Sequence, residues 1–149
     1  MATAAPLTED ELRQFVVDWF DLLDVHAPVE QVLPLVAEDD LEMVFPEVTV
    51  HGQGSFKDWY AKVTNRFFDE VHTLNEQRFS TAGDRGEIGL DLNWQAKIWQ
   101  PPAAKSQWLG FDVLQTWEMR RSGRTGKPEI VRYIVTKFDP MPGSAALPD

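Results

Sequence analysis

Apolar residues recur mostly at helical spacing up to about residue 67 and at alternate positions in the remainder of the chain. Thr8 and Glu11 have the spacing of a capping box, and Leu7 and Leu12 are placed to form a hydrophobic staple. The apolar residues that follow at helical spacing are Leu12, Phe15, Val16, Trp19, Leu22 and Leu23. The pattern therefore predicts an amphipathic helix that begins just after Thr8.

Two further helices are predicted before residue 70. Pro28 suits the first turn of a second helix, but Pro34 removes an internal hydrogen bond, so this helix should be kinked or short. A strand over 41–45 is then stopped by Pro46. Ser55 is the expected cap of a third helix. The apolar stripe of that helix consists of Phe56, Trp59, Tyr60, Val63 and Phe67.

The rest of the chain alternates as strands do. Strands are expected near 71–82, 87–99, 108–121 and 129–138, with turn residues at 83–86 and 122–128. Helices first and antiparallel strands afterwards indicate an α+β fold, in which three N-terminal helices pack in a strongly curved, mostly antiparallel sheet. We expect one domain over 1–149, with its core at about 8–139 and a flexible tail over 140–149.

Alternation also assigns the faces of the strands. In the 108–121 strand, Gln115 shares the apolar face that should meet the helices, and Glu118 lies on the opposite face, where Arg132 could pair with it. For the 87–99 strand, the sequence leaves open whether the apolar face of Trp94 or the polar face of Gln95 points into a pocket.

Composition narrows the function classes. A net charge of −10 argues against nucleic-acid binding, and the lack of cysteine excludes disulfides and thiolate chemistry. No apolar run approaches the ~18 residues of a membrane span, and the first residues do not form a signal peptide, so we expect a cytoplasmic protein that does not bind membranes. A basic cluster at Arg120, Arg121, Arg124 and Lys127 is interpreted as a solvated hairpin tip, with an anion site as the alternative.

Searches for catalytic motifs find nothing. The chain has no nucleophile elbow, P-loop or zinc-protease motif, and the glycines at 52 and 54 are better explained by a turn than by a dinucleotide site. His26, His51 and His72 lie in three different predicted elements, so their spacing indicates no metal site. We therefore expect no metal and no cofactor.

The stretch from Glu38 to His72, flanked by helices before it and strands after it, resembles the nuclear-transport-factor-2-like (SnoaL-like) superfamily. The resemblance implies a cone-shaped α+β barrel around one pocket. Ketosteroid isomerase, which has this fold, uses an Asp base and an oxyanion hole made of a Tyr and a protonated Asp. At the matching positions this chain has Phe45, Gln115 and either Trp19 or Phe20, so isomerase chemistry should not carry over.

A second resemblance concerns the small subunits of ring-hydroxylating dioxygenases. The run from Asp40 to Pro46 is similar to their Asp-x-x-Tyr-x-x-Pro pattern, with Met43 in place of the tyrosine. It supports the fold more than a function.

Single polar residues remain as candidates for chemistry. His72 follows the third helix at the expected pocket rim and is the candidate general base, although a histidine bonded to a backbone carbonyl is the favoured interpretation. Tyr60 is expected to be a core aromatic, and Gln115 should find a partner because burying a lone amide is costly. Asp39 and Asp40 are expected to be solvated. The expected pocket residues are Trp19, Phe45, Tyr60, Trp94, Gln115 and Trp117.

These observations suggest a domain that binds a small apolar molecule. The resemblance implies that, if catalytic, it acts as a lyase, isomerase, cyclase or hydrolase. The alternative is a non-catalytic dimerisation or partner-binding module. Because curved open sheets leave one face uncovered, we also expect a homodimer through the outer sheet face, with Leu114 and Trp108 on or near it.

Overall fold

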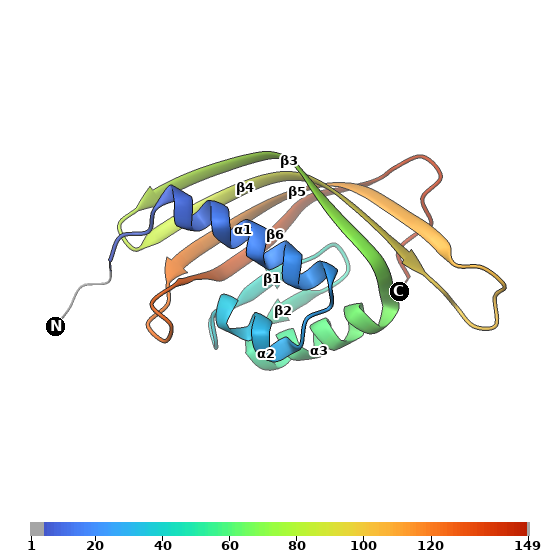
Figure 1. Cartoon of the computed structure of the whole chain (residues 1–149), viewed down its shortest axis with the longest axis horizontal. Coiled ribbons are helices and arrows are strands. Elements are labelled where there is room, and N and C mark those ends of the chain that lie inside the picture. The colour runs from blue at the N-terminus through green and yellow to red at the C-terminus, as the bar shows by residue number, and fades with distance from the viewer. Residues whose placement is uncertain (1–4, 149) are drawn as a thin grey trace.

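The computed structural model describes residues 5–148 and consists of three α-helices, a short 3₁₀ helix and six strands. The helices lie inside the curve of the sheet (Figure 1). The helices are α1 (Glu9–Asp24), α2 (Val29–Val32), η1 (Leu33–Leu35) and α3 (Gly52–Arg66). The strands are β1 (Glu42–Val44), β2 (Thr49–His51), β3 (Phe67–Ala82), β4 (Arg85–Ile98), β5 (Gln107–Arg121) and β6 (Pro128–Pro140). The predicted α+β class is confirmed.

The start of α1 follows the capping box predicted from the sequence. The Glu11 amide donates to Thr8 Oγ1 at 3.1 Å, and the Thr8 amide donates to Glu11 Oε1 at 3.2 Å. Leu7 and Leu12 are both buried, against Gly86 at the start of β4. A Cβ atom at Gly86 would lie 2.9 Å from Leu12 Cδ1, so the glycine lets the helix approach the sheet.

Two predictions about the other helices have different outcomes. Pro34 limits the second helix to one α-helical turn, which continues as η1, as predicted. The cap at Ser55 was wrong, because α3 begins at Gly52 with His51 as its N-cap. Gly52 has a φ of +74°, a conformation that only glycine adopts readily, so the chain turns directly from β2 into the helix. The Ser55 hydroxyl instead accepts a hydrogen bond from the His51 amide.

The sheet is mixed and does not close into a barrel. Its strand order is β2-β1-β6-β5-β4-β3, with β1 parallel to β6 and every other pair antiparallel. The sequence did not predict β2, a three-residue strand, and it placed the start of β3 four residues late. Because β3 follows α3 without a loop, His72 lies inside the strand and not at its beginning.

The inner face of the sheet is apolar, which settles the orientation of β4. Trp94 points inward and Gln95 outward. The buried side chains of β4 and β5 pack against an aromatic cluster in which Trp19 of α1 lies 6.0 Å from Trp117 and 5.9 Å from Tyr133, measured between ring centroids. Glu118 and Arg132 form the expected ion pair, at 2.8 Å, on the outer face.

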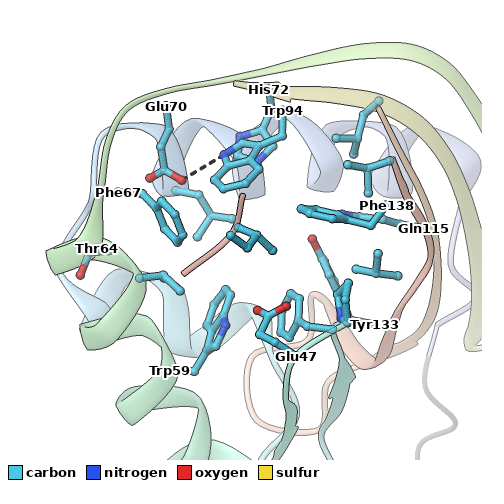
Figure 2. Close-up of a pocket in the computed structure, with 18 residues that line it drawn as sticks. Glu47, Trp59, Thr64, Phe67, Glu70, His72, Trp94, Gln115, Tyr133 and Phe138 are labelled. Atoms are coloured by element: carbon cyan, nitrogen blue, oxygen red, sulfur yellow. Dashed lines mark hydrogen bonds between the residues drawn. The ribbon is translucent and has the colours of Figure 1, made fainter. Parts of the chain in front are cut away.

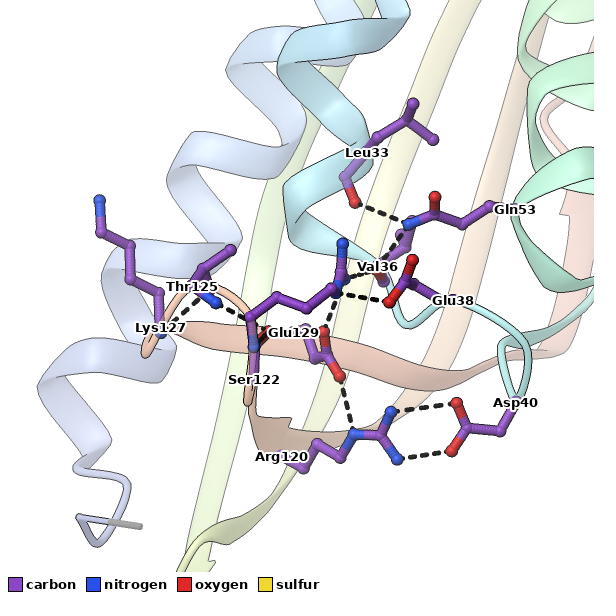
Figure 3. A network of polar contacts seen from close by, with 11 residues as sticks. Leu33, Val36, Glu38, Asp40, Gln53, Arg120, Ser122, Thr125, Lys127 and Glu129 are labelled. Carbon is purple, nitrogen blue, oxygen red and sulfur yellow. Dashed lines mark hydrogen bonds and ion pairs between the residues drawn. The ribbon is translucent and has the colours of Figure 1, made fainter. Parts of the chain in front are cut away.

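The tip of the basic hairpin between β5 and β6 is exposed over 123–127, as expected, but the arginines of the hairpin are held in ion pairs. Glu129, whose side chain is only 3% exposed, pairs with Arg120 at 2.7 Å and with Arg124 at 2.9 Å. Arg120 also forms two bonds to Asp40, and Arg124 reaches Glu38 at 3.2 Å (Figure 3). These arginines therefore tie the hairpin to the segment after η1, and their charges are already paired rather than free to hold an anion.

The tail after β6 lies along the sheet. The Met141 amide donates to the Gly110 carbonyl at 2.8 Å, and the Ala145 amide donates to the Trp108 carbonyl at 2.9 Å. These bonds direct Leu147 to the wall of a cavity inside the cone.

Candidate functional site

A cavity of about 110 Å³ opens between the inner face of the sheet, the end of α1 and one side of α3 (Figure 2). It is somewhat smaller than the roughly 150 Å³ that holds benzene in an engineered apolar cavity, but it is open to solvent, so a one-ring ligand can extend out of it. The 18 lining residues are Leu23, Phe45, Pro46, Glu47, Trp59, Val63, Thr64, Phe67, Glu70, His72, Leu92, Trp94, Val113, Gln115, Tyr133, Val135, Phe138 and Leu147.

His72 is held by a carboxylate at the edge of this cavity. Asp24 is the last residue of α1, and its Oδ1 atom lies 2.5 Å from His72 Nδ1. Its Oδ2 atom accepts a weaker bond from the His72 backbone amide, at 3.4 Å. A carboxylate on Nδ1 favours the tautomer that carries its proton there, which leaves Nε2 able to accept one. Nε2 has no hydrogen-bond partner among residues 5–148.

Aromatic rings fix the plane of the imidazole. Phe20 of α1 stacks on the His72 ring with 4.5 Å between centroids, and Trp94, the cross-strand partner on β4, lies at 6.5 Å on a nearly parallel plane. The His72 side chain is 10% exposed and that of Asp24 is 26% exposed. The pair is therefore largely shielded from water, and its geometry is fixed by packing as well as by hydrogen bonds.

A second histidine–carboxylate pair lies next to the first. The register of β3 shifts between Phe68 and Val71, with Asp69 at a φ of +53°, and this bulge turns Glu70 towards the cavity. His26 Nε2 lies 2.5 Å from Glu70 Oε2, and Trp94 Nε1 donates to Glu70 Oε1 at 3.2 Å. Both carboxylate oxygens of Glu70 are thus engaged.

Across the cavity, two polar side chains belong to β5 and β6. Gln115 accepts a hydrogen bond from Trp117 Nε1 at 3.0 Å, so the buried amide has found a protein partner, as the sequence led us to expect. Burial raises the pKa of the Tyr133 phenol, and the neighbouring Gln115 amide offsets only part of that rise. Tyr133 therefore remains a neutral hydroxyl at physiological pH.

The residues predicted to form the pocket divide into two groups. Phe45, Trp94 and Gln115 line the cavity, as does His72. The side chains of Trp19, Tyr60 and Trp117 are buried in the core instead. The Tyr60 hydroxyl donates to the Ala27 carbonyl, which anchors the loop after α1. Periodicity identifies the buried face of an element but not the part of that face that neighbouring side chains leave unfilled.

Sequence reasoning missed Asp24 and Glu70. Asp24 follows Phe20 by four residues, so it extends the buried stripe of α1, and a carboxylate in that position was the available signal. Glu70 gave no such signal, because the bulge before it breaks the alternation of the strand. The expected bond from His72 to a backbone carbonyl was also wrong, because its partner is the Asp24 carboxylate.

Across residues 5–148, no three histidine or carboxylate side chains gather as a bound metal ion would require. None of the helices described there is long and apolar enough to cross a membrane.

Solved structures with the same architecture are numerous. A protein provisionally named an aromatic ring hydroxylase, from Novosphingobium aromaticivorans, matches with a TM-score of 0.74 and 13% identity over 89% of this chain and 94% of its own. A provisionally named NTF2-like dehydratase from Streptomyces avermitilis gives 0.71 and 15% over 85% and 93%. A hexachlorocyclohexane dehydrochlorinase from Novosphingobium barchaimii gives 0.68 and 19% over 94% of each chain.

This chain has the nuclear-transport-factor-2-like fold. No protein-family model and no curated protein matches the sequence, so the assignment rests on the structure. At such low identities the nuclear-transport-factor-2-like relatives establish architecture alone.

Proposed function

We propose that this chain is a lyase in which the Asp24–His72 pair removes a proton from carbon in a small, largely apolar substrate. The observation that carries the proposal is the 2.5 Å contact between Asp24 and His72 Nδ1, at a histidine that lines the cavity and whose Nε2 has no hydrogen-bond partner among residues 5–148. A general base must be able to reach the proton it removes, and a substrate inside the cavity lies against this histidine.

The elimination would proceed as follows. His72 Nε2 accepts the proton, the C–H bonding electrons form the new double bond, and the leaving group departs from the adjacent carbon with its bonding pair. Chloride would leave as the anion, whereas hydroxyl would leave as water after taking the proton back from the His72 imidazolium. Asp24 stabilises the imidazolium that forms, because a carboxylate on Nδ1 attracts the positive charge in a partly dehydrated site. Gln115 and Tyr133 face the cavity as neutral groups that can orient polar atoms of the substrate.

Two of the similar structures support an elimination over other reactions. One carries the name of a dehydrochlorinase and the other, provisionally, that of a dehydratase, and both words describe loss of a small molecule to leave a double bond. Ketosteroid isomerisation, which the sequence argued against, would lack its base, because that position holds Phe45, whose ring stacks on Trp59 at 4.8 Å. Elimination needs only the base that is present.

The test uses a panel of one-ring compounds that carry chloride or hydroxyl on the carbon next to an acidified C–H bond. Formation of the double bond is followed by ultraviolet absorbance. For any compound turned over, His72→Gln should lower the rate roughly 10²-fold or more, because a general base contributes about 10²–10⁴-fold. Asp24→Asn should also lower it, with little change in KM.

His51→Gln is the matched control, because His51 lies outside the cavity and its side chain is 68% exposed. If His72→Gln turns over substrate at the wild-type rate, His72 is not the base. If that variant instead melts at a lower temperature and binds ligand normally, His72 has a structural role and the proposal fails. Binding without turnover by the wild-type protein across the whole panel would favour a non-catalytic ligand-binding domain.

A further inference from the structure

The charges on the cavity wall are all of one sign. Of the 18 lining residues, Glu47 and Glu70 are carboxylates and none is lysine or arginine. An anionic ligand would lose hydration on entering this cavity and meet carboxylates without a cation from the wall to compensate. The wall therefore selects against anions.

The two carboxylates differ in how they are held. Glu70 is bound on both oxygens, by His26 and by the Trp94 indole. Glu47 follows Pro46 in the β1–β2 turn, is exposed, and forms no hydrogen bond or ion pair with any other residue in 5–148. Its carboxylate faces the cavity beside the Trp59 ring (Figure 2). Glu47 thus places an unpaired negative charge where the cavity meets solvent.

Aromatic rings lie at the same end of the cavity. Phe45 and Trp59 stack with 4.8 Å between centroids and 15° between planes, and Tyr133 lies 5.6 Å from Phe45. The faces of such rings attract a cation within about 6 Å of the centroid, and tryptophan attracts it most strongly. An organic ammonium group can give up part of its hydration to these rings, whereas a small inorganic cation cannot do so as readily.

We propose that the cavity takes a substrate with one positive charge, an aryl- or alkylammonium compound, whose charged group lies between Trp59 and Glu47. Its apolar body then extends inward past Phe67 and Trp94 towards His72. The inference rests on the proposed function in that the same molecule would be the substrate of the Asp24–His72 pair. It adds a preference for a positively charged substrate, which the elimination itself does not require.

The test compares three unreactive probes of nearly equal shape. Phenyltrimethylammonium, tert-butylbenzene and benzenesulfonate differ chiefly in carrying a positive, zero or negative charge. Binding to the full chain is measured by calorimetry and by quenching of tryptophan fluorescence, because Trp59 and Trp94 line the cavity. We expect the cation to bind about tenfold more tightly than the neutral probe, a ratio in the range that cation–π contacts provide. The anion should not bind measurably.

Substitutions test whether Glu47 and Trp59 cause the preference for the cationic probe. Glu47→Gln should weaken cation binding roughly threefold to tenfold and leave the neutral probe unchanged, an effect that shrinks as salt is added. Glu87→Gln, on an exposed position of β4 outside this cavity, makes the same change in net charge and should alter neither. Trp59→Leu should weaken the cation more than the neutral probe.

Equal or tighter binding of the neutral probe, or any specific binding of the anion, overturns the inference. So does a Glu47→Gln variant that keeps the full preference for the cation. Because the probes carry no leaving group, these results are independent of turnover. Cation binding without elimination by any compound would refute the proposed lyase alone, whereas His72-dependent turnover of neutral compounds without cation binding would refute this inference alone.

Discussion

Replacing Glu129 by alanine should destabilise the fold by about 3 kcal/mol, because this buried carboxylate joins two arginines of the β5–β6 hairpin. Glu129 Oε2 accepts from Arg120 Nε at 2.7 Å, and Oε1 accepts from Arg124 Nη2 at 2.9 Å. The Glu129 side chain is 3% exposed, against 27% and 36% for the two arginines. Truncation therefore removes two charge-assisted bonds from a site that water reaches poorly.

The magnitude follows from what remains after truncation. A hydrogen bond to a charged group contributes about 1.5–3 kcal/mol, and breaking a buried ion pair costs about 3–5 kcal/mol. Arg120 keeps both bonds to Asp40, and Arg124 keeps Glu38 and the Val36 carbonyl. Neither arginine is left without a partner, so the lower end of the range of about 3–5 kcal/mol for a broken buried ion pair applies. For a chain of this size, about 3 kcal/mol corresponds to a fall in melting temperature of roughly 6–12 °C.

Urea unfolding followed by tryptophan fluorescence measures the change, with the melting temperature as a second readout. The midpoint should fall while the slope of free energy against denaturant stays constant, because the surface exposed on unfolding is unchanged. Glu118→Ala is the control, because Glu118 pairs with Arg132 on the outer face, where the two side chains are 47% and 45% exposed. That variant should lose less than about 1 kcal/mol. If the two variants are equally stable, the buried network does not contribute as argued.

Three further expectations concern titration and assembly. The Arg120 guanidinium beside Asp40 lowers the pKa of that carboxylate, so the ionised Asp40 stabilises the fold above the unfolded pKa of about 3.9, and this stabilisation is lost as the pH falls. Asp40→Asn should therefore make the free energy of unfolding fall less steeply on the acid side. An unchanged acid transition would contradict this. Burial raises the pKa of Tyr133, so the contribution of its neutral phenol to the free energy of unfolding is present below the unfolded pKa of about 10 and falls by up to roughly 1.4 kcal/mol per pH unit above it. Between pH 9 and 11, the free energy of unfolding should therefore decline less steeply for Tyr133→Phe than for the wild type. We also expect a homodimer through the outer sheet face near Leu114 and Trp108, which sedimentation at micromolar concentration measures, and a monomer there would count against it.

Local interactions explain what the sequence predicted well. The capping box of Thr8 and Glu11 and the apolar stripe of α1 depend on residues at most four positions apart, and α1 begins where that pattern indicates. Pro34 shortened the second helix through its own missing amide. The four long strands were found because alternation over many residues is a strong signal.

The predictions that failed depend on contacts distant in sequence. The short strand β2 exists because it pairs with β1, which in turn lies parallel to β6, about 90 residues away in the chain. The start of α3 moved to Gly52 because the chain must turn sharply out of β2. No pattern within a short window contains either constraint.

The candidate site depends even more on tertiary structure. The sequence by itself singled out His72, and it made the inner apolar faces and the neutral Gln115 predictable. It could not pair His72 with Asp24, which is 48 positions earlier, or bring Glu70 to His26 across a bulge in β3. Side-chain periodicity determines which face of an element is buried. Only the packing of all the elements together decides which buried polar groups meet, and where the aromatic side chains leave a cavity unfilled.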